Sequence, residues 1–208
     1  MTKYLSALTL VSLIFLSCEY SQKDEFIIKE YDSIHDEDSV NALIEIPAGT
    51  LEKWEYNKIT SDIELELINN KPRIISYLCY PANYGMIPKT LLPKENGGDG
   101  DPLDVIVIGP AEPRGNIVKC KIIGVLYLVD NFEQDDKLIA ISSKSNLENV
   151  NNIVDLDNSY NGISKILEIW FTNYKKGGQI KSKGFGDSIS ALNILKDSRN
   201  HYFNKKLF

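Results

Sequence analysis

The 208-residue chain is poor in the side chains that build zinc sites. It has two histidines and three cysteines, Cys18, Cys79 and Cys120, and the cysteines form no CxxC pair. Structural zinc centres need several closely spaced Cys or His ligands, so a zinc site is not expected. Cys79 and Cys120 lie in strand-like runs and are expected to be free, buried thiols, with a disulfide between them as the alternative.

The chain also lacks an excess of positive charge. Its 29 acidic residues outnumber its 23 basic residues, which gives a net charge of −6. Proteins that bind nucleic acid need a cationic face, so no nucleic-acid partner is expected. The sequence contains no Walker loop, GxGxxG or GxSxG motif, and therefore no motif for nucleotide cradling or serine hydrolysis.

The apolar run near the N-terminus, Tyr4–Leu16, is too short to span a bilayer as a helix, which needs about 20 residues. It follows the basic residue Lys3 and precedes Ser17 and Cys18, a pattern typical of a secretory signal. The cysteine resembles the lipidated residue of bacterial lipoproteins. A lipid on Cys18 would hold the protein on a membrane without a spanning helix.

From this pattern we expect a signal peptide over residues 1–17, a charged tether over 18–40 and the folded domain over 41–208. The expected location is the cell envelope, either periplasmic or anchored to the membrane by lipid. A cytoplasmic protein with a misassigned start is the alternative.

Short β-rich segments dominate the first part of the domain, and helical spacing follows. Strands are predicted at Ala42–Pro47, Trp54–Asn57, Ile63–Ile68, Arg73–Tyr80, Asp104–Ile108, Ile117–Val129 and Lys137–Ile141, with a bulge or bend at Gly124. Helices are predicted over Ile163–Tyr174 and Ser188–Phe203, the latter with Ile189, Leu192, Ile194 and Leu195 facing inward. This order predicts an α+β, mainly β fold: a small closed barrel with flanking C-terminal helices.

Two acidic turns carry the strongest chemical signal. Asp99, Asp101 and Asp104 lie in a turn that enters an apolar strand, and a second cluster follows the long strand: Asp130, Glu133, Asp135 and Asp136. Such carboxylates repel one another unless a cation compensates, and hard divalent cations such as Mg²⁺ prefer carboxylate oxygens. Each turn alone could instead be solvated. If both open at one end of a barrel, they form a single pocket for several metal ions.

Further polar side chains suit a small polyanion. Glu45 lies inside the apolar segment LIEIP, where a carboxylate needs a reason. Cationic and phenolic residues that could neutralise a phosphate-type substrate are spread along the chain: Lys53, Arg73, Tyr80, Tyr84, Lys137, Tyr174 and Lys175.

Four blocks in this order resemble the soluble inorganic pyrophosphatases of family I. They are EIPAGTLEKWEYNK, YPANYGMIPKT, GDGDPLDVIVIG and LVDNFEQDDKLIAI, and Tyr174-Lys175 follows a predicted helix. The resemblance covers about residues 41–180. It implies a five-stranded oligonucleotide-binding-type closed barrel, several Mg²⁺ ions per active site, hydrolysis of diphosphate to two phosphates, and a homo-oligomer.

The resemblance also implies residue roles. Asp101 resembles the catalytic carboxylate that activates the attacking water. The implied metal ligands are Asp99, Asp101, Asp104, Asp130, Asp135, Glu45 and Glu55, and the implied substrate-binding residues are Lys53, Arg73, Tyr84, Lys137, Tyr174 and Lys175. Asn131 departs from the family, in which many members have Glu. The alternative functions are an inactive membrane-anchored scaffold and a hydrolase of another phosphoanhydride.

Overall fold

The computed structural model describes residues 30–205, apart from 38, 148, 176 and 178. The predicted signal peptide and Cys18 lie outside the described residues. The described part of the predicted tether is folded, because β1 (Ile34–Asp36) pairs with β2 (Ser39–Ile46) and the adjacent Ser33 is buried. The folded domain therefore begins ahead of residue 41. In the described part of the chain, no helix is both long and apolar enough to cross a membrane.

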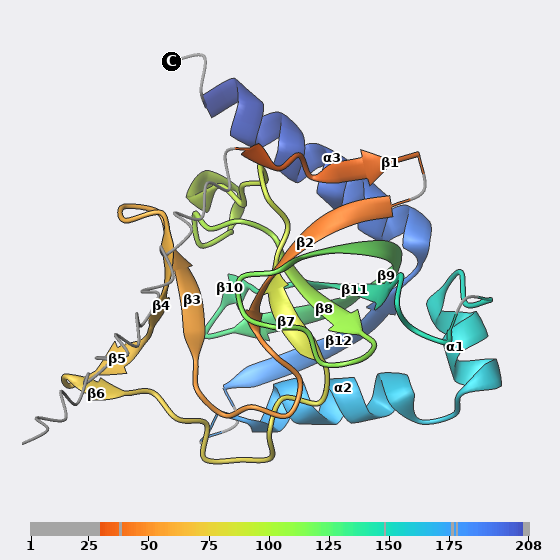
Figure 1. The fold of residues 1–208 in the computed structure, drawn as a ribbon, viewed down its shortest axis with the longest axis horizontal. Helices are drawn as coiled ribbons and strands as arrows, with labels where there is room; N and C mark the ends of the chain where they lie inside the picture. Colours follow the sequence, from red (N-terminus) through yellow and green to blue (C-terminus); the bar gives the residue numbers. More distant parts are fainter. Residues whose placement is uncertain (1–29, 38, 148, 176, 178, 206–208) are drawn as a thin grey trace, which may run out of the picture.

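Five strands close into a barrel (Figure 1). β2 pairs with β7 (Asn83–Met86), β7 with β8 (Asp104–Ile108), β8 with β11 (Lys137–Ser142), β11 with β9 (Ile117–Asp130), and β9 again with β2. The β8–β11 pair is parallel and the other four pairs are antiparallel. This arrangement confirms the predicted five-stranded oligonucleotide-binding-type barrel.

The strands β8 and β11 are apolar along both faces because both faces are covered. Ile106 and Ile139 belong to a core cluster that includes Trp170. Their neighbours Val105 and Leu138 belong to a second cluster. Since successive side chains of a strand point to opposite faces, a strand covered on both sides is continuously apolar, as DVIVI is.

The long strand β9 contacts several partners along its length. It pairs with β2 and β11, and near its end with β10 (Glu133–Gln134) and β12 (Ile180–Gly186). The ladder with β11 shifts register beside Gly124, where a Cβ would lie 2.4 Å from Ile153 Cγ1 and 2.7 Å from the Gly186 carbonyl oxygen. The predicted irregularity at Gly124 is confirmed, and it allows this close approach.

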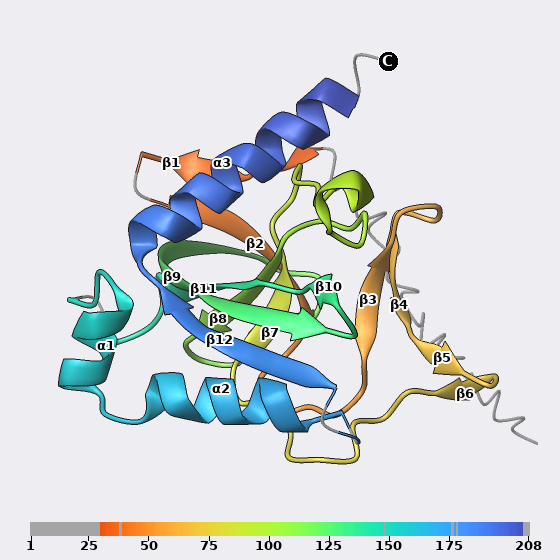
Figure 2. The same ribbon diagram turned by 180° about the vertical axis from the view of Figure 1, so that it is seen from behind.

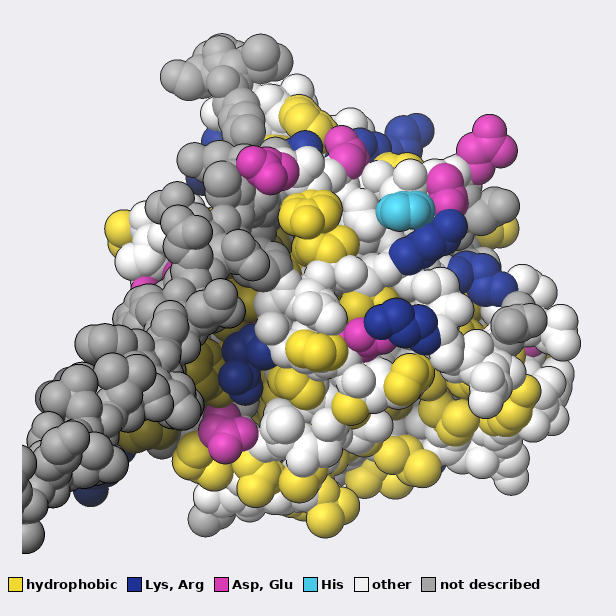
Figure 3. Space-filling model, viewed as in Figure 1, with side chains coloured by type: hydrophobic (Ala, Val, Ile, Leu, Met, Phe, Trp, Pro, Cys, Tyr) yellow, Lys and Arg dark blue, Asp and Glu magenta, His cyan; other side chains and the backbone are white. Residues whose placement is uncertain are grey.

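Helices cover the outside of the barrel (Figure 2). The short helix α1 (Ile153–Ser159) precedes α2 (Ile163–Asn173), and both lie across the barrel from α3 (Ser188–Lys205). The predicted helix at Ile163–Tyr174 is confirmed. Its outer face keeps exposed apolar side chains, Ile166 and Ile169 among them, and Figure 3 shows apolar side chains along this edge of the molecule.

The helix α3 confirms the predicted span but packs through a different face. Its buried residues are Ala191, Leu195 and Ser198, whereas Ile189 is 68% exposed and Leu192 48% exposed. The predicted inner face is wrong at those two positions. Small side chains at 191 and 198 let the helix lie close to β9, which bulkier residues would prevent.

Two β-hairpins project from the barrel as an arm, defined here as residues 54–72 (Figure 1). The first consists of β3 (Trp54–Asn57) and β4 (Asp62–Leu65), and the second of β5 (Leu67–Ile68) and β6 (Lys71–Pro72). The second hairpin turns at Asn69-Asn70, where both φ angles are positive. Asn tolerates this left-handed conformation, which a two-residue type I′ turn requires.

The segment that follows the arm corrects two expectations. The predicted strand Arg73–Tyr80 is wrong, because this segment is irregular apart from one bridge between Ile74 and Glu52. It crosses the surface and packs only some of its apolar residues, so Leu78 is exposed. Cys79 is consequently an exposed thiol, and Cys120 is a buried one; both are free.

Candidate active site

A cavity of about 750 Å³ opens between the arm and the end of the barrel. Its walls come from the arm, from β2, β7 and β8, from the turn after β9, and from the end of α2. All thirteen residues that the sequence predicts for metal or substrate binding line it: Glu45, Lys53, Glu55, Arg73, Tyr84, Asp99, Asp101, Asp104, Asp130, Asp135, Lys137, Tyr174 and Lys175. The fold thus brings residues from distant parts of the sequence into one site.

The first acidic turn is held by short-range hydrogen bonds. The Asp99 carboxylate accepts a bond of 2.8 Å from the Asp101 amide, and Gly100 between them has a φ of +86°. The Leu92 amide donates to the Asp101 carbonyl at 2.9 Å, which ties the turn to the preceding loop. Burial raises the pKa of Asp99, and the charges of Asp101 and Asp104 raise it further, against the lowering effect of the Asp101 amide.

The second acidic turn explains a departure from the family pattern. Asn131 and Phe132 form the two-residue turn between β9 and β10, and both have positive φ, +49° and +75°. Asn adopts this conformation at lower cost than Glu, so the turn geometry gives a physical reason for Asn131. The turn brings Asp130 and Asp135 to the same cavity wall.

Lys137 is buried between two carboxylates. Its side chain is 5% exposed, and its Nζ contacts Asp104 Oδ2 and, at 2.5 Å, Asp135 Oδ1. Burial alone would lower the pKa of this lysine, but the two carboxylates outweigh it and leave the pKa raised. Burial raises the pKa of Asp135, partly offset by Lys137. An ammonium group therefore occupies the space between two of the predicted metal ligands.

Glu45 lies in an apolar strand, and its side chain lines this cavity. Its side chain is buried, and Oε1 accepts a hydrogen bond of 2.7 Å from the Tyr56 amide. Burial raises its pKa to about 7, with Lys53 lowering it and Asp104 raising it. The protein itself poorly neutralises the charge of a carboxylate at this position. A bound cation would supply the missing positive charge.

The cationic side chains surround an aromatic wall. The Nζ atoms of Lys53 and Lys137 lie 5.4 and 5.7 Å from the centre of the buried Tyr84 ring. The Tyr174 ring stacks on Trp170 with centroids 4.8 Å apart and planes 6° apart. Lys175, next in sequence, pairs with Asp130.

Sequence reasoning missed several residues of the same cavity, notably Lys58, Glu64 and Glu66 on the arm. Lys58 lies in the β3–β4 turn; its Nζ donates to the Gly100 carbonyl at 2.8 Å and pairs with Asp101. Lone charged residues in a polar hairpin give no sequence signal. Only the fold of the arm onto the acidic turn brings them into the site.

Comparison with known proteins agrees with this geometry. The sequence model of the family described as inorganic pyrophosphatase matches residues 42–203. The chain belongs to the inorganic pyrophosphatase family. Its relatives include the inorganic pyrophosphatase of Corynebacterium efficiens, 34% identical over 168 residues that cover 79% of this chain and 98% of the relative. That of Rickettsia prowazekii is 32% identical over 177 residues, 82% of this chain and 96% of the relative.

Solved pyrophosphatase structures share the fold. The inorganic pyrophosphatase of Schistosoma japonicum superposes with a TM-score of 0.78 and 29% identity, covering 83% of this chain and 70% of that one. The Thermus thermophilus enzyme has a TM-score of 0.69 and 28% identity, covering 81% and 93%. These matches confirm the predicted family and the predicted barrel.

Pyrophosphatases of this family depend on metal, and the donor set fits that requirement. Ten carboxylate-bearing side chains line the cavity against five lysines and arginines, and Asp130 Oδ1 is buried without a hydrogen-bond partner among the described residues. Within the described part of the chain, no three Asp, Glu, His or Cys side chains lie close enough to hold one metal ion. Lysines contact several of these acids: Lys137 pairs with Asp104 and Asp135, Lys58 with Asp101, and Lys175 with Asp130.

Proposed function

We propose that this chain hydrolyses inorganic diphosphate to two phosphates with Mg²⁺ as its metal. One observation carries the proposal: the carboxylates and the phosphate-binding cations predicted from separate sequence blocks line one cavity, in the fold of the pyrophosphatases. The carboxylate surplus favours a hard divalent cation over softer metals.

The proposed metal ligands are carboxylates that line the cavity. Asp99, Asp104 and Asp135 hold metal, and three further carboxylates of the cavity, Asp130, Glu45 and Glu55, serve additional ions, in part through water. Bound there, Mg²⁺ supplies a water of lowered pKa and offsets the charge of the phosphates.

Asp101 is the proposed catalytic residue. Its carboxylate is half-exposed to the cavity, so a water molecule can reach it. Asp101 takes a proton from the attacking water, whose oxygen forms a bond to one phosphorus while the bridging P–O bond breaks. The freed phosphate keeps the bridging oxygen, and the two products together carry the atoms of diphosphate and water.

The cationic wall holds the leaving phosphate. Lys53, Arg73 and Tyr84 line one side of the cavity, and Lys137, Tyr174 and Lys175 complete the set. Their positive charges and phenolic hydroxyls offset the negative charge that grows on the departing phosphate. Binding both phosphates in one orientation also reduces the entropic part of the barrier.

A phosphate-release assay tests the proposal. The full chain is incubated with diphosphate, triphosphate or a nucleoside triphosphate, each with Mg²⁺ and with EDTA. We expect fast release from diphosphate with Mg²⁺ and little release in EDTA. Faster release from triphosphate or nucleotides would instead support a hydrolase of another phosphoanhydride, and no release from any substrate would support an inactive scaffold.

We further propose that residues 1–17 direct export, that Cys18 carries lipid, and that the protein self-associates. The sequence pattern at Cys18 supports the first two, and family membership supports the third. Mass spectrometry of the protein isolated from its own cells tests lipidation and cellular location. Analytical ultracentrifugation of the domain tests self-association, and a single monomeric species would contradict it.

A further inference from the structure

Three backbone segments meet at the base of the arm in a closed ring of hydrogen bonds. The Lys53 amide donates to the Arg73 carbonyl at 3.0 Å, the Arg73 amide to the Glu66 carbonyl at 2.8 Å, and the Glu66 amide to the Lys53 carbonyl at 2.9 Å. All three side chains line the same cavity. The backbone therefore fixes one carboxylate between two residues that bind phosphate in the proposed function.

The side chains of Glu66 and Arg73 are hydrogen-bonded to each other, as their backbones are. Arg73 Nη1 donates to Glu66 Oε1 at 2.9 Å and to Oε2 at 2.7 Å. The Arg73 side chain is 21% exposed and the Glu66 side chain 24% exposed. Water therefore screens this pair less than it screens a surface ion pair. Among the described residues, these are the guanidinium's side-chain hydrogen bonds, and both use Nη1.

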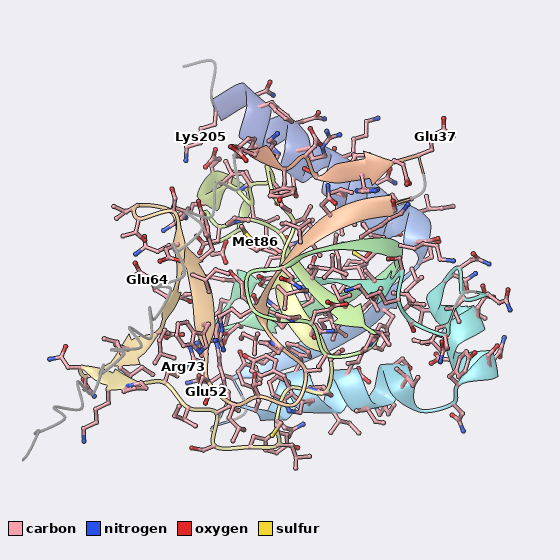
Figure 4. All side chains as sticks on the ribbon, viewed as in Figure 1. Glu37, Glu52, Glu64, Arg73, Met86 and Lys205 are labelled. Atoms are coloured by element: carbon pink, nitrogen blue, oxygen red, sulfur yellow. The ribbon has the colours of Figure 1, made fainter. Side chains whose placement is uncertain are left out.

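A carboxylate in a site for a polyanion repels the ligand, so its presence needs a compensating role. A neighbouring arm carboxylate, Glu64, bonds within its own hairpin, to Asn57 Nδ2 and Thr60 Oγ1. Glu66 instead contacts an arginine of the cavity wall, and Figure 4 labels Arg73 near the base of the arm and Glu64 nearer its tip. Arginine recognises phosphate through a planar fork, which must be oriented to donate two bonds at once.

We propose that Glu66 is a positioning residue for substrate binding. It holds the Arg73 guanidinium by one nitrogen, so that Nε and Nη2 keep a fixed direction toward a phosphate group of diphosphate. This inference rests on the proposed function, in which Arg73 binds substrate. It assigns a role in phosphate recognition to an acidic residue that never touches the phosphate.

A double-mutant cycle tests the inference. We compare wild type, Glu66→Gln, Arg73→Met and the double variant for the KM and kcat of diphosphate hydrolysis, and for the Kd of inorganic phosphate by calorimetry. We expect Glu66→Gln to raise KM about tenfold, the loss of one charge-assisted contact, while kcat changes less than twofold. In the Arg73→Met background, Glu66→Gln should have no further effect.

Two more variants separate orientation from charge. Glu66→Asp keeps the charge but shortens the side chain, so positioning predicts a raised KM and electrostatics alone predicts none. Asp62→Asn removes a charge from the same arm but outside the cavity, and should leave KM within twofold. Melting temperatures of all variants report whether each is folded.

The possible failures are distinguishable. If Arg73→Met leaves KM unchanged, the assignment of Arg73 in the proposed function is wrong. If Arg73→Met raises KM but neither Glu66→Gln nor Glu66→Asp does, Glu66 does not position it. An effect of Glu66→Gln that persists without Arg73, or that Asp62→Asn reproduces, also overturns the inference.

Discussion

Replacing Lys137 by methionine perturbs the charge balance of the active site at its most buried point. The ammonium group contacts Asp104 and Asp135, and its side chain is 5% exposed. Methionine keeps most of the volume but removes the charge, so two carboxylates remain side by side without the cation. Removing one partner of a buried ion pair costs about 3–5 kcal/mol, a large part of the roughly 5–15 kcal/mol that stabilises a typical domain.

The assay is chemical unfolding followed by tryptophan fluorescence, with EDTA and with Mg²⁺. In EDTA, Lys137→Met should unfold with a free energy about 3–5 kcal/mol lower than wild type. Mg²⁺ should restore more stability to the variant than to wild type, because a divalent cation replaces the missing charge; binding at 100 times its Kd contributes about 2.7 kcal/mol. Lys196→Met, at an exposed position on α3, is the matched control. A loss below about 1 kcal/mol in EDTA, or an equal Mg²⁺ effect in both proteins, would refute the reasoning.

Three further perturbations follow from the same structure. Because burial raises the pKa of Glu45 from 4.5 to about 7, the metal-free protein should lose roughly 3 kcal/mol relative to Glu45→Gln as the pH rises from about 4.5 to about 7. Unfolding in EDTA near pH 4 and pH 8 measures this loss, and a pH-independent difference would contradict it. Burial raises the pKa of the Cys120 thiol to about 12, so a thiol reagent should label Cys79 in the folded protein and Cys120 only after unfolding, as peptide mass mapping would show. Gly124→Ala should cost about 1–3 kcal/mol, seen as a lower Tm, because its Cβ would lie 2.4 Å from Ile153 Cγ1; an unchanged Tm would mean that the strand can move.

The sequence predicted the barrel where local pattern and tertiary burial agree. The segment DVIVI predicts the strand Asp104–Ile108 with both ends correct, because a strand covered on both faces is apolar throughout. The acidic turns were predicted to share a cavity and do so.

The errors occur where tertiary contacts, and not the local sequence pattern, determine the structure. Sequence reasoning missed β7 because NYGM has an internal glycine and no alternation of apolar and polar residues. It missed β12 because IKSKGFG carries lysines and glycines that do not alternate with apolar residues. The inner face of α3 follows small residues such as Ala191, which a count of large apolar side chains overlooks. The role of Glu66 depends on a ring of backbone bonds between three segments, which no local pattern encodes.

The most direct test of the account is the turnover of Asp101→Asn. If this carboxylate activates the attacking water, the variant should bind Mg²⁺ and inorganic phosphate with Kd values close to those of wild type, while kcat for diphosphate falls by about 10² or more. Asp197→Asn, at an exposed position on α3, should retain wild-type turnover. Near-normal turnover by Asp101→Asn, with Mg²⁺ bound, would contradict the central claim.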